Sequence, residues 1–159
     1  MLIGKKIILR PLNSSDLSFL KQIENNSENW IFGSENKMFS DKELLEYISN
    51  SNTNIKDAKQ FRWLIEFNNI STGFIDLYDY DKKKAFMGII IDKNYRKKGI
   101  AKDAIHLIFK YAFDELKLEK LYSKVLNSNI PSINLFNSCG FKLDRKKDKF
   151  QIFLKLAGQ

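Results

Sequence analysis

The chain has 159 residues, of which 43% are hydrophobic, and a formal net charge of +8. This length fits one domain with a sizeable core, and neither a long apolar stretch nor a leader-like start supports a membrane span or a secretory signal. Its single cysteine, Cys139, excludes an internal disulfide and a cysteine-rich metal site, so we expect a cytoplasmic protein.

The positive charge is concentrated in three stretches, 82–84, 93–102 and 142–149. Such an excess attracts polyanions, so a nucleic-acid-binding protein is one hypothesis. No zinc-finger spacing, helix-turn-helix signature or aromatic-basic ribonucleoprotein motif accompanies the charge. A multiply phosphorylated small ligand explains it as well, and we predict a protein that binds neither nucleic acid nor membrane.

The first part of the chain predicts one strand and two helices. Residues 6–11 are rich in aliphatic side chains and end at a proline, which is typical of an opening strand. Ser14 or Ser15 is then placed to cap a first helix. Farther along, Ser40 and Glu43 have the spacing of a capping box, which predicts the start of a second helix.

Three strands are expected next. Apolar and polar residues alternate over 61–67, and Asn68 with Asn69 supplies a turn that tolerates left-handed geometry. This pattern predicts a hairpin into a strand over 72–78. After a charged turn, residues 85–91 predict a third strand, whose isoleucine run suits a central position covered on both faces.

The most informative motif is the basic loop after this third strand. A strand, a glycine-bearing basic loop and a helix N-terminus in that order form an anion cradle that suits a pyrophosphate. The sequence contains neither a P-loop motif nor a dinucleotide-binding fingerprint, so the main support for a nucleoside triphosphate or NAD as the ligand is missing. An ordinary solvated turn is the alternative reading. The predicted cradle residues are Arg96, Lys97, Lys98, Gly99, Ile100, Ala101 and Lys102.

The rest of the chain predicts two helices and two strands. The first helix covers 99–117, and a strand over 121–126 follows it. Asn129 is placed to cap the second helix, and Gly140 supplies the left-handed residue that ends it. Residues 150–156 predict a closing strand.

Four short motifs occur in a fixed order: Ile89-Ile90-Ile91, Arg96-x-x-Gly99-x-Ala101, Asn129-x-x-Ser132 and Cys139-Gly140-Phe141. Together they resemble the GNAT superfamily of acetyl-coenzyme A-dependent N-acetyltransferases, and Arg10-Pro11-Leu12 is similar to the branch of spermidine and ribosomal-protein N-terminal enzymes. The resemblance implies one N-acetyltransferase domain over residues 1–159. Its fold class would be α/β (α+β), with a mixed, largely antiparallel sheet flanked by helices in the order β-α-α-β-β-β-α-β-α-β-β.

The same resemblance implies acetyl-coenzyme A (acetyl-CoA) as co-substrate and no metal. It places Ile89, Ile90 and Ile91 along the pantetheine arm and the cradle residues on the pyrophosphate. A backbone N–H within 90–92 would polarise the thioester carbonyl. Asn129 and Ser132 would lie near the thioester, although Asn129 could be only a helix cap.

Two residues depart from the pattern that the family implies at chemical positions. Phe136 stands where a tyrosine usually protonates the leaving thiolate, and Phe86 stands where a glutamate is frequent. We assign Asp76 as the catalytic base, with Glu66 as the other acidic residue in a strand-like run. The candidates for the missing acid are Tyr78, Tyr80, Tyr122 and Cys139, and we assign this role to Tyr78.

The acceptor is expected to be a primary amine: a polyamine, a small amine or a protein N-terminus. The basic balance of the chain opposes a polycation unless acidic residues cluster locally. The predicted acceptor wall consists of Trp30, Phe32, Glu35 and Glu66.

Two further hypotheses stay open. The departures at Phe86 and Phe136 also fit a coenzyme-binding sensor or interaction module that has lost catalysis. Exposed strands such as residues 150–156 could pair across a homodimer, or could be covered internally.

Overall fold

The computed structural model describes residues 1–32 and 37–159, except for the side chains of residues 30–32. The order of strands and helices implied by the resemblance is confirmed, with a short strand and a short helix added. The elements are β1 (Leu2–Ile3), β2 (Ile7–Pro11), η1 (Ser14–Asp16), α1 (Leu17–Glu24), η2 (Ser27–Phe32), α2 (Asp41–Asn50), α3 (Ile55–Ala58), β3 (Phe61–Phe67), β4 (Ile70–Asp81), β5 (Lys84–Ile91), η3 (Lys93–Tyr95), α4 (Ile100–Phe109), η4 (Lys110–Glu115), β6 (Lys120–Leu126), α5 (Ile130–Ser138), β7 (Lys142–Lys147) and β8 (Phe150–Leu156).

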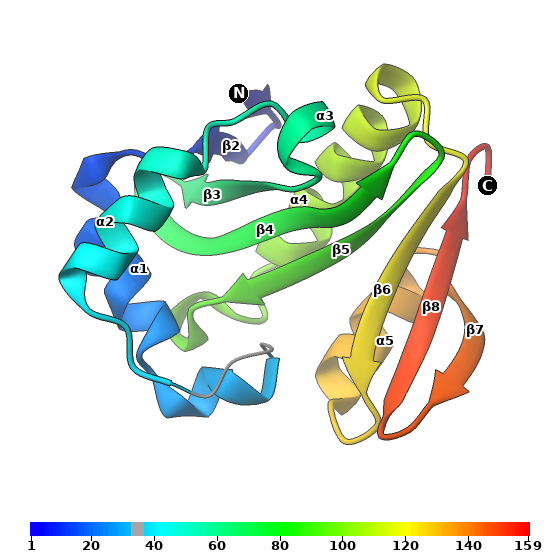
Figure 1. The fold of residues 1–159 in the computed structure, drawn as a ribbon. Coiled ribbons are helices and arrows are strands. Elements are labelled where there is room, and N and C mark those ends of the chain that lie inside the picture. Colours follow the sequence, from blue (N-terminus) through cyan, green and yellow to red (C-terminus); the bar gives the residue numbers. More distant parts are fainter. Residues whose placement is uncertain (33–36) are drawn as a thin grey trace.

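The strands form one sheet in the order β1-β2-β3-β4-β5-β6-β8-β7. Neighbouring strands are antiparallel except for β5 and β6, which are parallel. This parallel pair is short, since residues 84–86 of β5 pair with residues 120–122 of β6. Beyond these rungs the two strands diverge, which opens a V in the sheet (Figure 1). We call this opening the splay, β1–β5 the large half, and β6–β8 the small half.

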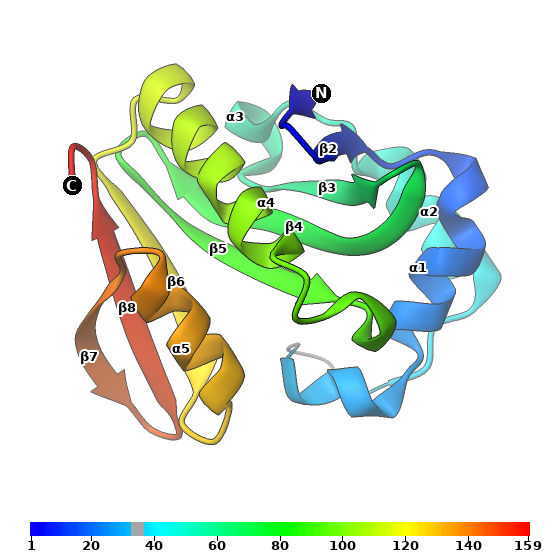
Figure 2. The same cartoon turned by 180° about the vertical axis from the view of Figure 1, so that it is seen from behind.

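Helices cover the two halves differently. On the large half, α1 and α2 pack on one face, which we call the first face, and α4 packs on the second (Figures 1 and 2). The first-face core joins Leu20 and Leu44 of these helices to Leu64 and Phe74 of the strands. On the small half, α5 lies on the second face, and no α-helix of the described residues lies on the first (Figure 2).

Most local expectations about caps and turns are confirmed. The Ser40 hydroxyl accepts a hydrogen bond from the Glu43 N–H at 3.1 Å, as the capping box requires. Asn68 and Asn69, with φ of 51° and 64°, are both left-handed in the hairpin turn, and Gly140 is left-handed with φ of 91° after α5. The start of the first helix is different: Asn13, not Ser14 or Ser15, provides the side-chain cap, because it accepts the Ser15 N–H at the start of η1, and α1 follows η1 without a side-chain cap of its own.

One longer element also differs from expectation. The helix predicted over 99–117 stops as α4 at Phe109 and continues as the π-helical turn η4, in which chain spacing widens. The Leu116 N–H accordingly donates to the Tyr111 carbonyl, five residues earlier.

The strand over 150–156 is not a sheet edge. β8 pairs with β6 on one side and β7 on the other, so the alternative of internal cover is the one observed. The edge strand on this side of the sheet is β7, whose residues are all exposed and mostly charged, as is common for edge strands. A homodimer stays a prediction.

Candidate active site

The first element of the site is the end of β5, which runs along the splay. Ile90 pairs with Phe74 of β4, and the Asp92 N–H donates to the Thr72 carbonyl at 2.8 Å. Backbone groups of alternate residues in a strand point to opposite sides. The N–H and C=O groups of Ile90 therefore face β4.

The odd-numbered residues of β5 face the other way. The Met87 carbonyl accepts from the Ser123 hydroxyl of β6 at 3.2 Å, and the Ile91 carbonyl accepts from Arg96 Nε at 2.9 Å. Both contacts lie on the side away from β4, so the Ile89 backbone also points into the splay. Ile89 and Ile91 thus offer N–H groups where a pantetheine arm was predicted, whereas Ile90 packs its side chain on the first-face core.

The predicted anion cradle is an open turn at the start of α4. Lys97 and Gly99 both have left-handed backbones, with φ of 62° and 80°. The first helical bond runs from the Asp103 N–H to the Gly99 carbonyl at 3.1 Å, so the N–H groups of 100–102 precede it. A Cβ built on Gly99 would meet nothing within 4 Å. The turn therefore has room and donors for a phosphate group, and the residues present fit a coenzyme pyrophosphate.

Arg96 holds this turn in place. Its Nε bond to the Ile91 carbonyl ties the loop to the end of β5. Lys97, Lys98 and Lys102 are exposed and supply positive charge around the turn. Their contact with a phosphate stays a prediction.

Asn129 caps α5, as the sequence indicates. Its side-chain oxygen accepts the Ser132 N–H at 3.3 Å, and Pro131 lies in the first helical turn. This accounts for both motif residues as structure. Their place near a thioester stays a prediction.

Asp76 and Tyr78, the two residues assigned to catalysis, lie together beside the splay. Both project from β4 on the first face, and Gly88 pairs with Asp76 from β5. A Cβ built on Gly88 would lie 2.9 Å from Asp76 Oδ1 and 3.7 Å from Tyr78 Cε1. The carboxylate and the ring thus occupy the space that the missing side chain leaves, two residues past the last rung at Phe86.

Arg62 of β3 holds the Asp76 carboxylate in place. Its guanidinium lies 3.5 Å from Asp76 Oδ2 and 2.7 Å from Glu24 Oε1. The same group lies 5.5 Å from the ring centroids of Tyr47 and Phe74. Burial raises the pKa of Asp76 above its ordinary value, an effect that Arg62 opposes. The result is a carboxylate of increased basicity with a fixed orientation.

Three stacked rings extend from Asp76 across the splay. Tyr78 and Phe86 have centroids 5.5 Å apart, and Phe86 and Tyr122 have centroids 5.2 Å apart, each pair at 26°. We call these three residues the aromatic row. Burial, with Asp76 and Asp79 adding to it, raises the pKa of Tyr78 to about 12. Its hydroxyl therefore stays protonated at neutral pH and is available as a hydrogen-bond donor.

The other candidates for the missing acid lie elsewhere. Phe136 is buried in the second-face core, with its ring centroid 5.2 Å from that of Phe141. Tyr80 and Cys139 are buried in the same core, and burial raises the pKa of the Cys139 thiol. Of the four candidates, only Tyr78 and Tyr122 share the face of Asp76.

Of the predicted acceptor wall, only Glu66 has a described side chain. Glu66 binds Arg10 at 2.5 Å, and Arg10 also binds Asp16, so this carboxylate belongs to a separate ion-pair group. Trp30 and Phe32 fall in η2, where their side chains lie outside the description, and Glu35 lies outside the described residues.

Four contributors near Asp76 were missed by the sequence interpretation: Glu24, Tyr47, Arg62 and Gly88. Strand pairing offers a signal for two of them, because Arg62 and Gly88 flank Asp76 in register. Glu24 and Tyr47 come from helices, whose approach to the strand the sequence does not encode locally.

No group of three or more His, Cys, Asp or Glu side chains in the described residues is placed to hold a metal ion. No helix in the described part of the chain has the length and apolar character to cross a membrane.

Comparison with known proteins identifies relatives over most of the chain. Residues 6–142 match the acetyltransferase (GNAT) domain family. Spermidine N(1)-acetyltransferase of Escherichia coli (strain K12) is 29% identical over 138 residues, which cover 86% of this chain and 73% of that protein.

Solved structures share the fold at lower identity. Spermidine N-acetyltransferase from Vibrio cholerae, in complex with CoA and spermine, has a TM-score of 0.84 at 24% identity and 96% coverage of both chains. A ribosomal L7/L12 alpha-N-protein acetyltransferase in complex with coenzyme A has a TM-score of 0.84 at 15% identity, covering 98% of this chain and 96% of that one.

Proposed function

Because the chain belongs to the GNAT acetyltransferase family, we propose that it transfers the acetyl group of acetyl-CoA to a primary amine by direct attack. Family membership confirms the expected fold and enzyme class, an acetyl-CoA-dependent acyltransferase. The observation that carries the finer proposal is the Asp76 carboxylate held over Gly88, beside the splay. A base at this point lies where an amine on the first face can meet a thioester in the splay.

The main chain provides the coenzyme site. Acetyl-CoA, when bound, supplies an activated acetyl thioester. The N–H groups of 97–102 hold its pyrophosphate, with the helix N-terminus adding favourable charge. Ile89 and Ile91 direct N–H groups into the splay, where one of them polarises the thioester carbonyl.

Asp76 accepts the proton that the acceptor amine loses. The neutral amine nitrogen forms the new C–N bond while the C–S bond breaks, and the nitrogen becomes strongly acidic as it does so. Its surplus proton passes to Asp76 and then to solvent. The raised pKa of Asp76 favours this transfer.

Tyr78 assists the leaving sulfur as a hydrogen-bond donor. A free thiol has a pKa of about 8.5, well below the value of about 12 to which burial raises the pKa of Tyr78. Full proton transfer from the phenol is therefore unfavourable. The sulfur leaves as a thiolate that accepts the Tyr78 hydrogen bond and takes its proton from solvent.

The charges around Asp76 support an ammonium ion as the resting form of the acceptor. Among the described contacts, the Glu24 and Asp76 carboxylates both lie against the Arg62 guanidinium, so two acidic groups meet at one cation. An ammonium group is attracted there before it loses its proton. The names of the spermidine-acetylating relatives support an amine acceptor in the same way.

Coenzyme binding is tested by its effect on thermal stability. We expect saturating acetyl-CoA to raise the melting temperature. At a concentration of 100 times Kd, the ligand should add about 2.7 kcal/mol to the free energy of unfolding. Gly99→Val removes the shift, because valine does not adopt a φ of 80°. Gly158→Val is the matched control, since Gly158 has a φ of 81° and equally open surroundings at the other end of the chain. Absence of a shift in the wild-type protein would reject the proposal.

A second candidate function is a coenzyme-binding module without catalysis. It is favoured by Phe136, which is buried in the core and leaves the usual tyrosine hydroxyl without a replacement there. Thiol release with a panel of amines and peptides separates the two candidates. Steady release with any acceptor eliminates the inactive module.

A further inference from the structure

The first face of the small half is basic. Strand pairing places three rows of side chains on this face, each crossing β6, β8 and β7 in register. The rows are Tyr122–Leu154–Lys142, Lys124–Ile152–Arg145 and Leu126–Phe150–Lys147. We call Lys124, Lys142, Arg145 and Lys147 the basic face; all four are exposed.

This face holds cations without acidic side chains among its rows. Residues 117–159 contain nine Lys or Arg and three Asp or Glu, so they carry +6 of the total charge of +8. One acid, Asp144, lies at the bulge of β7 and is bound to Arg145 at 2.7 Å. The field over this face therefore attracts anions and repels polycations.

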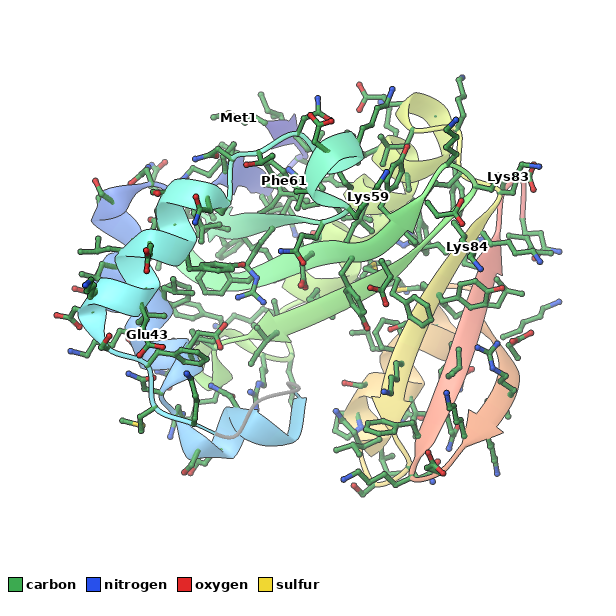
Figure 3. The ribbon with its side chains drawn as sticks, in the orientation of Figure 1. Met1, Glu43, Lys59, Phe61, Lys83 and Lys84 are labelled. Carbon is green, nitrogen blue, oxygen red and sulfur yellow. The ribbon has the colours of Figure 1, made fainter. Side chains whose placement is uncertain are left out.

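Aromatic rings lie beneath these cations. Arg145 lies 5.9 Å from the Tyr122 ring centroid, and Lys124 Nζ lies 4.1 Å from that of Phe150. The side chains of β6 and β8 stand on this face without a covering α-helix (Figure 3). The aliphatic parts of the Lys124 and Arg145 side chains cover the rings, while their charged ends stay in solvent.

The basic face continues into the catalytic site through the aromatic row. From Arg145 the path passes to Tyr122, then Phe86 at 5.2 Å and Tyr78 at 5.5 Å, and ends beside Asp76. One end of this path is an acidic group that holds an amine. The other end is a cluster of cations.

We propose that the acceptor amine is carried by an acidic polypeptide, whose carboxylates bind the basic face while its amine reaches Asp76. This inference rests on the proposed function. Small ligands occupy concave sites, whereas this surface is an exposed sheet face, and four cations over three rows suit several anionic groups in sequence. An extended peptide rises about 3.3 Å per residue, so a few residues span the path.

The test compares acceptors that differ only in charge. Three hexapeptides share a free N-terminus and two small residues, followed by four glutamates, four glutamines or four lysines; spermidine is the fourth acceptor. We expect kcat/KM to be highest for the glutamate peptide, by about tenfold over the glutamine peptide at low salt, and to converge as salt rises. An N-terminally blocked glutamate peptide should inhibit without reacting.

Charge reversal on the basic face is the matching variant. The double substitution Lys124→Glu with Arg145→Glu should abolish the preference for the glutamate peptide and raise kcat/KM for the lysine peptide. Lys110→Glu, on the opposite side of the molecule in η4, makes the same change of charge and should alter neither. Anisotropy of a labelled, blocked glutamate peptide measures binding independently of turnover, and melting temperatures confirm that each variant is folded.

The outcomes are distinct. Equal or better use of spermidine or the lysine peptide, unchanged by the double substitution, overturns the inference and leaves the proposed function intact. Tighter binding of a labelled RNA oligonucleotide than of the peptide, lost in the double variant, also overturns it and identifies a nucleic-acid surface. Failure of every amine to release thiol rejects the proposed function itself.

Discussion

The large and small halves of the sheet are built from similar strands but are covered differently. The large half has α1 and α2 on one face and α4 on the other, whereas α5, on the second face, is the only described α-helix that covers the small half (Figures 1 and 2). The difference explains a division of labour. Double cover fixes Asp76 against Arg62, and single cover leaves a surface beside it on which a large acceptor can lie.

The contrast also appears in how closely strands approach. A Cβ built on Gly73 would lie 2.3 Å from the Ile90 carbonyl oxygen, so β4 and β5 approach too closely there for any side chain. At the splay, by contrast, β5 and β6 separate after three rungs. A tightly paired strand thus borders an open gap, which is the arrangement a backbone-lined coenzyme site requires.

Loss of a leucine from the first face should destabilise the large half more than the small half. Leu64 is fully buried on the first face of the large half, and Leu154 is half-buried on the first face of the small half. Leu64→Ala should lower the free energy of unfolding by about 3 kcal/mol and Leu154→Ala by about 1 kcal/mol. Urea denaturation measures both. Equal losses would show that the small half is as well covered as the large one.

The next effect concerns the base. Asp76→Asn should lower kcat/KM by about 100-fold, because the amide cannot accept the amine proton. Asp79→Asn is the matched control, since Asp79 is exposed with a φ of 49° that asparagine tolerates.

The pH profile identifies the group. In the wild type, kcat/KM should fall as pH drops and Asp76 becomes protonated, around a pKa raised above 3.8 by burial. The Asn variant should lack this acidic limb. A limb that survives in the variant assigns it to another residue.

A smaller change in activity is expected from a substitution at Gly88, beside the splay. Gly88→Ala puts a methyl group 2.9 Å from Asp76 Oδ1, so the carboxylate must move while the backbone can stay. We expect about a tenfold loss in kcat/KM with little change in melting temperature. Unchanged kinetics would mean that the position of this carboxylate does not matter for the reaction.

The smallest change is expected from a substitution at Phe136, on the covered face of the small half. Phe136→Tyr restores the hydroxyl that the family resemblance implies, but places it among Phe141 and Phe153. Burying it without a partner should lower stability by about 1 kcal/mol and leave kcat unchanged. An increase in kcat would instead show that a proton donor at this position is missing from the natural chain.

Much of the fold followed from short-range patterns. Alternation over 61–67, the paired asparagines and the capping box at Ser40 each depend on neighbours within a few residues, and each is confirmed. The π-helical turn η4 was missed because a single turn of six residues is too short to establish an apolar period of its own. The charged strand β7 has no period-two signal of its own and was implied only by the family resemblance.

The parts of the site that lie on one short segment could be predicted from the sequence, and the parts assembled from distant segments could not. The cradle around Gly99 lies on one loop, so sequence alone indicates it. The partners of Asp76 come from α1, α2, β3 and β5, which meet only through tertiary packing. The ion pair of Glu66 with Arg10 likewise required the pairing of β2 with β3.

The direction of the backbone groups along β5 has a consequence for amide exchange. Ile90 faces β4 and Ile89 faces the splay, although they are adjacent in the chain. In deuterium oxide, the amide proton of Ile89 should exchange quickly and that of Ile90 slowly. Occupation of the splay should slow the first and leave the second as it was, so two neighbouring residues become a built-in reporter and its reference.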